Sequence, residues 1–179
     1  MRVSGQTGTG PGVATVREQE RLRDRPASML TLRVAVGQFG GLGALTRSLT
    51  RELRAAGAHV MPLDEPDAVA QAGAANHFGA HVYLGFEGTQ DTRSTVHFYK
   101  VPTFESVGGR ALATCLVTQL ASVDLVVAAP CGMRLPVLRE TKMPAVLCSL
   151  GPLRLVLDLA PDLTRAVMLA LSVWTTHPI

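Results

Sequence analysis

The sequence is poor in lysine, in aromatic residues and in cysteine. Among its 179 residues only Lys100 and Lys142 are lysines, so the formal charge of +3 rests on arginine, and aromatic residues make up 4 %. The three cysteines, Cys115, Cys131 and Cys148, are an odd number at wide spacing, which argues against a disulfide framework or a CxxC site. We expect them to be small buried apolar side chains.

Long apolar runs are also missing. The N-terminal "MRVSGQTGTGPGVATV" lacks the apolar region of a secretory signal, and no uncharged apolar run approaches the roughly 18 residues of a membrane span. The arginines between Arg17 and Arg25 alternate with acids and have no aromatic partners. This pattern favours a solvated linker and predicts no nucleic-acid partner.

The composition supports one domain. Hydrophobic side chains make up 47 % of the chain and charged ones 17 %, which suits a single core with a tail. We expect a flexible leader or linker at 1–28, with a short charged helix at Val16 to Asp24. From 29 to 179 strand-like and helix-like segments alternate, which predicts a three-layer α/β domain with a mainly parallel sheet. The predicted strands are 32–37, 58–64, 80–86, 95–101 and 144–150. The predicted helices are 42–57, 66–77, 105–122 and 162–174. Short strands or an irregular crossing are predicted at 124–130 and 135–141.

A glycine loop joins the first strand to the first helix. The spacing of Gly37, Gly41 and Gly43, with Asp64 after the second strand, resembles the dinucleotide fingerprint of short-chain dehydrogenases. Their Tyr-x-x-x-Lys catalytic pair is absent, because no lysine follows either tyrosine by four residues. A tight strand-to-helix turn is therefore the favoured interpretation, and an NAD(P)-binding oxidoreductase remains as a third hypothesis.

Two later stretches carry a family resemblance. "AGAANHFGAHVYLGFEGT" places Ala75 and Asn76 at a helix end before a strand, and "VLRETKMPAVL" leads into the last strand. Between about Leu53 and Trp174 the chain resembles the catalytic domain of the zinc-dependent N-acetylmuramoyl-L-alanine amidases, which cleave peptidoglycan. The resemblance implies an amidase-like α/β domain over 29–179.

The family's catalytic positions are changed in this chain. The resemblance implies a zinc ion held by two histidines and a glutamate, with a second glutamate as general base. The histidine positions hold Phe39 and Glu87, the general-base position holds Ser149, and the loop to the glutamate ligand is deleted before Gly43. A phenyl ring cannot bind zinc, and serine cannot replace a carboxylate base at neutral pH. We therefore predict no catalytic residue, no metal site and no cofactor.

Three histidines are candidates for a rebuilt site. His77 lies at a helix end, His81 begins a predicted strand, and His97 lies in the next one. His81 and Glu87 share a strand face but are about 20 Å apart, which is too far for a shared metal ion. The sequence thus favours no rebuilt metal site.

The last strand places neighbouring residues on opposite faces. Alternation points Ser149 toward the site and Cys148 into the core, so a thiol nucleophile is disfavoured. The segment "LRETKMP" adds charged side chains near the mouth of the site, where they contact a stem-peptide carboxylate or serve only solubility. The candidate ligand groove consists of Glu87, Arg139, Glu140, Lys142 and Ser149.

The favoured hypothesis is a degenerate amidase, or pseudoenzyme, of cell-wall metabolism. It would bind a peptidoglycan fragment (a muropeptide) or a cell-wall-synthesis protein without cleaving it. The first alternative is an active amidase with a relocated site. As written, the chain is expected to be cytoplasmic; a place in the cell wall follows if it is a fragment of a longer exported protein.

Overall fold

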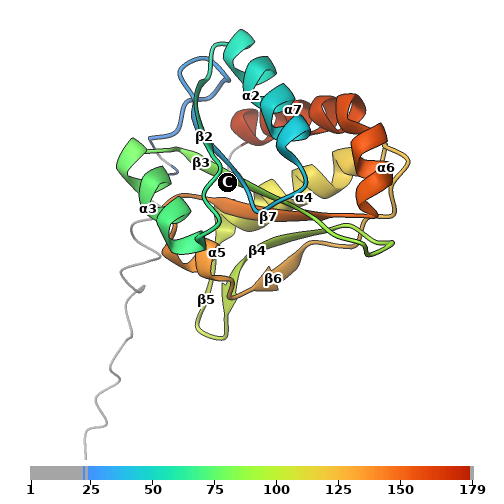
Figure 1. Ribbon diagram of the computed structural model, residues 1–179. Helices are drawn as coiled ribbons and strands as arrows, with labels where there is room; N and C mark the ends of the chain where they lie inside the picture. The colour runs from blue at the N-terminus through green and yellow to red at the C-terminus, as the bar shows by residue number, and fades with distance from the viewer. Residues whose placement is uncertain (1–21, 23, 178–179) are drawn as a thin grey trace, which may run out of the picture.

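A mixed seven-stranded sheet lies between two layers of helices in the computed structural model, which describes residues 22 and 24–177 (Figure 1). The strand order is β2-β1-β3-β7-β4-β5, and β6 pairs with β4. Strand β4 runs antiparallel to β7 and β5, while the other pairs are parallel. The predicted three-layer α/β fold with a mainly parallel sheet is confirmed.

The elements follow one another as strand-helix units with a short hairpin in the middle. Their bounds are β1 Arg33–Gln38, α2 Gly43–Ala55, β2 His59–Leu63, α3 Ala68–Phe78, β3 Val82–Gly88, β4 Thr95–Val101, β5 Phe104–Glu105, α4 Val107–Leu120, β6 Cys131–Met133, α5 Pro136–Glu140, β7 Ala145–Leu150, α6 Leu153–Asp158 and α7 Ala160–Thr176.

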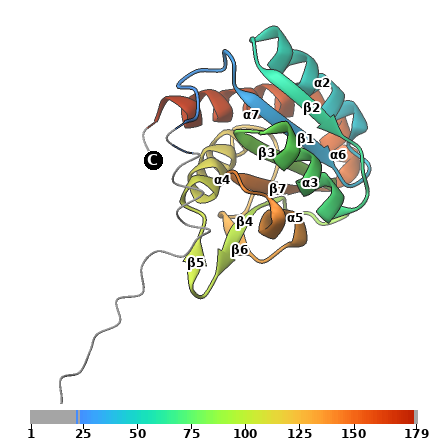
Figure 2. The same cartoon turned by 90° about the vertical axis from the view of Figure 1, so that its left-hand side faces the viewer.

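The two faces of the sheet carry unequal cores. Helices α2, α4 and α7 cover one face over the larger core, and α3 with α5 covers the other over a smaller one (Figure 2). Helix α2 buries Leu45, Leu49 and Leu53, whose spacing of four residues puts them on one side of the helix. Gly57 follows at φ 91°, in the left-handed region that ends helices.

The crossovers determine where a site forms. Helix α2 joins β1 to β2 on one face of the sheet, and α3 joins β2 to β3 on the other. The strand order therefore reverses between β1 and β3, and open α/β sheets bind ligands at the carboxyl ends of such strands. Phe39 follows β1, while Glu87 and Ser149 lie near the carboxyl ends of β3 and β7.

Of the two segments predicted as short strands or an irregular crossing, 124–130 is an irregular crossing and 135–141 is neither. Residues 124–130 form no strand beyond a single bridge from Val127 to Ser94, and β6 follows at Cys131–Met133. Residues 135–141 contain the helix α5, because Pro136 takes its first turn and Val137 and Leu138 bury one side.

The predicted helix at Val16 to Asp24 falls almost entirely outside the described residues. The end of the predicted leader packs on the domain: the guanidinium of Arg25 lies 4.3 Å from the centroid of the Trp174 ring, and Leu22 packs against the larger core. In the described part of the chain no helix is both long and apolar enough to cross a membrane.

A buried polar network joins three elements beneath the strand ends. The fully buried Gln71 of α3 donates through Nε2 to the carbonyls of Gln38 (2.8 Å) and Glu65 (2.5 Å) and accepts from the Tyr83 hydroxyl (2.8 Å). Burial raises the pKa of Tyr83 far above its ordinary value. A Cβ at Gly37 would lie 2.0 Å from Gln71 Oε1 and 2.4 Å from the Tyr83 hydroxyl oxygen. Packing therefore explains the glycine at position 37.

We predict that Tyr83→Phe lowers the free energy of unfolding by about 1–3 kcal/mol, since it leaves a buried acceptor of Gln71 without its donor. Gly37→Ala should cost more, because two fixed groups occupy the space of the new methyl. Urea denaturation measures both. Tyr99→Phe is the control. Tyr99 is a half-buried residue of β4, and its variant should change the free energy of unfolding by less than about 0.5 kcal/mol. Equal losses for the two tyrosine variants would contradict the role of the network.

Candidate functional site

Strand register brings Glu87 and Ser149 together. They are direct partners in the parallel pairing of β3 with β7, so their side chains leave the same face. The Ser149 hydroxyl donates a hydrogen bond to Glu87 Oε1, and both side chains are partly buried. The structure thus places together the two residues at which the family resemblance implies a zinc-binding histidine and a general base.

His97 joins this pair from β4. Thr95 lies opposite Ser149 and His97 opposite Leu147 in the antiparallel pairing of β4 with β7, so His97 shares the face of Glu87. Within the described chain, its buried Nδ1 has no hydrogen-bond partner. Burial lowers the pKa of His97, and the Glu87 carboxylate opposes this shift only in part. His97 is therefore neutral at pH 7.

The other two candidate histidines lie elsewhere. His81 precedes β3 at its opposite end, where its Nδ1 accepts a hydrogen bond from the Arg33 backbone N–H at 3.0 Å. His77 is in the last turn of α3. The expected separation of His81 from Glu87 follows from the five residues of β3 that lie between them.

The cysteines divide between the two faces. Cys148 is fully buried in the larger core, and burial raises the pKa of its thiol to about 12, which fits the predicted core-facing side chain. Cys115 and Cys131 are only partly buried, contrary to the expectation for all three. Cys131 is the parallel partner of His97, an arrangement that the sequence did not signal because residues 124–133 lack a strand period.

The glycine loop is closed by apolar side chains. Phe39 donates its backbone N–H to the Phe86 carbonyl at 2.9 Å and packs against the smaller core. A methyl at Gly41 would lie 3.3 Å from Leu153 Cδ1, and one at Gly88 would lie 2.7 Å from the same atom. Leu153 of α6 thus covers the loop where a dinucleotide would place its pyrophosphate.

The residues at the strand ends do not fit a zinc ion. Phe39 offers no ligand, and Glu87 is hydrogen-bonded to Ser149. Across residues 22 and 24–177, no three His, Cys, Asp or Glu side chains are placed to hold a metal ion. A site with two histidines and a glutamate cannot be assembled from these side chains.

Arg139, Glu140 and Lys142 line a different pocket. It has a volume of about 230 Å³ and includes the aromatic rings of Tyr99 and Phe104. The pocket lies before the amino end of β7, whereas Glu87 and Ser149 lie at the carboxyl end. The four residue steps of β7 from 145 to 149 span about 13 Å. The structure therefore separates the predicted groove into two places.

Asn76 fixes the backbone beside this pocket. Its Nδ2 donates to the Glu140 carbonyl at 2.8 Å, and its Oδ1 accepts from the Lys142 backbone N–H at 2.9 Å. One amide thus joins the end of α3 to the segment between α5 and β7. Here Asn76, singled out from the sequence, has a structural role.

Solved amidase domains share this fold. The catalytic domain of CwlV, an N-acetylmuramoyl-L-alanine amidase from Bacillus (Paenibacillus) polymyxa var. colistinus, superposes with a TM-score of 0.66 at 15 % identity, covering 80 % of this chain and 98 % of that one. The amidase AmiC2 of Nostoc punctiforme gives 0.60 at 16 %, covering 79 % and 96 %. An amidase from Clostridium difficile 630 gives 0.57 at 17 %, covering 77 % and 95 %.

These likenesses define the fold as that of N-acetylmuramoyl-L-alanine amidase catalytic domains. No protein-family model matches the sequence, and no curated protein matches it significantly. The amidase-like fold inferred from "VLRETKMPAVL" and its neighbours is confirmed.

We predict that His97 makes stability depend on pH in a defined direction. Burial holds its folded pKa below the ordinary 6.5, so between these two values the unfolded chain binds more protons than the folded one. The free energy of unfolding should therefore fall as pH drops through about 6.5 toward the folded pKa. Urea denaturation between pH 5 and 8 should show a shallower fall for His97→Gln. A difference between the two proteins that does not vary with pH would contradict this account.

Proposed function

We propose that this domain is a non-catalytic binding module that recognises peptidoglycan fragments at the carboxyl ends of β3 and β7. The observation that carries the proposal is the hydrogen bond from Ser149 to Glu87. It joins the two positions at which the family resemblance implies a zinc ligand and a general base. A carboxylate and a hydroxyl can bind polar groups there, but neither Ser149 nor Phe39 can activate water.

The chemistry of the Glu87, Ser149 and His97 side chains suits a peptide ligand. The Ser149 hydroxyl donates to one oxygen of Glu87, and a carboxylate accepts several hydrogen bonds in total. Neutral His97 adds one ring donor and one ring acceptor on the same face. Muropeptides carry amide and amine N–H groups that would donate to such acceptors.

A second candidate is the binding of a partner protein. One structural neighbour, the CwlD amidase from Clostridioides difficile, was solved in complex with the GerS lipoprotein; it has a TM-score of 0.55 at 12 % identity. An active amidase with a relocated site has less support. His97 is the neutral base that such a site would need, but the Ser149 hydroxyl is directed to Glu87.

We predict that the purified chain binds a muropeptide and releases no peptide from it. Calorimetry measures binding, and mass spectrometry of the incubated muropeptide measures cleavage. Glu87→Gln should weaken binding at least about tenfold, since a hydrogen bond to a charged group contributes about 1.5–3 kcal/mol. Asp162→Asn, an exposed acid of α7 paired with Arg165, is the matched control and should leave binding unchanged.

Release of peptide by the unaltered chain would overturn the non-catalytic assignment. Absence of muropeptide binding would overturn the proposed ligand, and a purified partner protein would then be the next probe. Equal weakening by the two variants would show that Glu87 acts only through net charge.

A further inference from the structure

A groove lies between α2 and the edge strand β2, and neither Glu87 nor Ser149 is among its lining residues. Its volume is about 430 Å³, which is within the range of small-molecule sites. Apolar side chains from the two strands line part of it, among them Val36 and Pro62. Gln38 and Gly43 line it where β1 ends and α2 begins.

Three arginines of α2 line this groove: Arg47, Arg51 and Arg54. Their spacing of four and three residues puts them on one flank of the helix, where like charges repel one another. The acid among the lining residues is Asp64, and its carboxylate accepts a hydrogen bond from Gln38 Nε2 at 2.7 Å. Three arginines and one carboxylate thus line the groove, and this excess of positive charge favours an anionic ligand.

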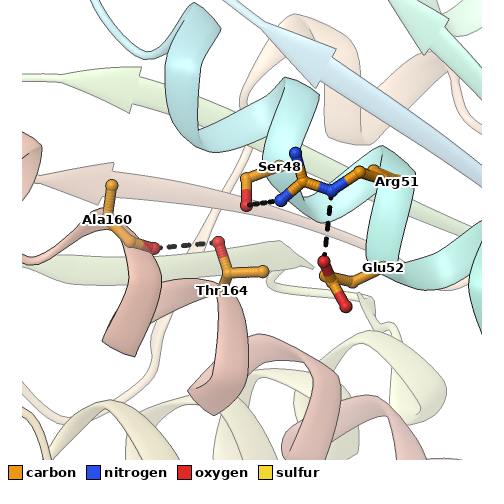
Figure 3. A network of polar contacts seen from close by, with 5 residues as sticks. All are labelled: Ser48, Arg51, Glu52, Ala160 and Thr164. Atoms are coloured by element: carbon orange, nitrogen blue, oxygen red, sulfur yellow. Dashed lines mark hydrogen bonds and ion pairs between the residues drawn. The ribbon is translucent and has the colours of Figure 1, made fainter.

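The protein compensates these cations only weakly. Arg51 lies 3.3 Å from Glu52 and 3.4 Å from Ser48 beside α7 (Figure 3), but this pair is exposed and contributes little. Arg54 donates to the Val60 carbonyl at 3.0 Å, which holds its side chain along β2. Arg47 Nη1 would lie 3.1 Å from a Cβ at Gly43, so the glycine lets this side chain lie against the backbone at the start of α2.

Two residues of the groove wall have unsatisfied polar atoms. Gln38 Oε1 and Thr50 Oγ1 are buried and have no hydrogen-bond partner within the described residues. Thr50 is only 7 % exposed. A buried polar atom without a partner destabilises a protein, so these atoms favour a ligand that brings hydrogen-bonding groups of its own.

We propose that this groove binds a small phosphorylated ligand that carries ring hydroxyls, such as a sugar phosphate or a nucleotide. The phosphate lies on Arg47 and Arg54, where charge-assisted hydrogen bonds hold it. Rotation of the Gln38 and Thr50 side chains would present their buried oxygens to the ring hydroxyls, and the apolar side chains cover the ring. This site differs from the dinucleotide fingerprint, because helix-borne arginines and not the glycine loop hold the phosphate. It shares no residue with the site at Glu87 and Ser149 that is proposed to bind peptidoglycan fragments.

Calorimetric titration of the full chain tests the site with four probes: ribose 5-phosphate, uridine monophosphate, inorganic phosphate and ribose. We expect one of the two organic phosphates to bind at least about tenfold more tightly than inorganic phosphate or ribose. The tighter of the two shows whether the ligand is a sugar phosphate or a nucleotide. Arg47→Gln should raise its dissociation constant about tenfold. Thr50→Val tests the hydroxyl contact and should raise it several-fold. Arg165→Gln, which removes an exposed arginine of α7, should leave it unchanged.

The same titrations define the contradicting results. Organic phosphates that bind no more tightly than inorganic phosphate would indicate an adventitious ion only and overturn the site. So would the absence of any binding, or equal effects of Arg47→Gln and Arg165→Gln. Across residues 22 and 24–177 the Arg47 side chain makes no hydrogen bond or ion pair, so its variant should fold normally, and circular dichroism checks this.

Discussion

The close approach of Gln71 and Tyr83 to Gly37 is the contact on which the strand ends depend. Gln71 comes from α3 and Tyr83 from β3, and both fill the space that a side chain at position 37 of β1 would need. The same amide holds the carbonyl of Gln38, the last residue of β1. One buried network therefore fixes β1 against β3 where the strand order reverses. The positions of Phe39 and Glu87 follow from it.

The register of β3 with β7 then determines which side chains meet at the carboxyl ends of these strands. Parallel pairing of β3 with β7 makes Glu87 and Ser149 neighbours, and alternation along β7 buries Cys148 on the opposite face. The two oxygen-bearing side chains satisfy each other, and Phe39 packs against the smaller core. The face thus offers acceptors and donors to a polar ligand, and Ser149 lies at the position where the family resemblance implies a general base. These strand ends belong to a fold shared with N-acetylmuramoyl-L-alanine amidase domains.

Local patterns predicted the fold, because each helix and strand of the parallel units has its own apolar period. The family resemblance singled out Phe39, Glu87 and Ser149, and the register of β3 with β7 makes the last two neighbours. The place of His97 depends on the antiparallel register of β4 with β7, which no local pattern determines. The shift of Arg139 to another pocket depends on α5, a five-residue helix too short to show a period. The groove beside α2 was missed because Arg47 and its neighbours look like an ordinary solvated helix face.

The central claim is that the strand ends bind ligands without a metal ion. Native mass spectrometry of the full chain equilibrated with equimolar zinc tests it most directly. We expect the unaltered protein to show only the mass of the metal-free chain. Glu87→Ala should likewise carry no bound zinc. A stoichiometric zinc adduct that disappears in Glu87→Ala would contradict it.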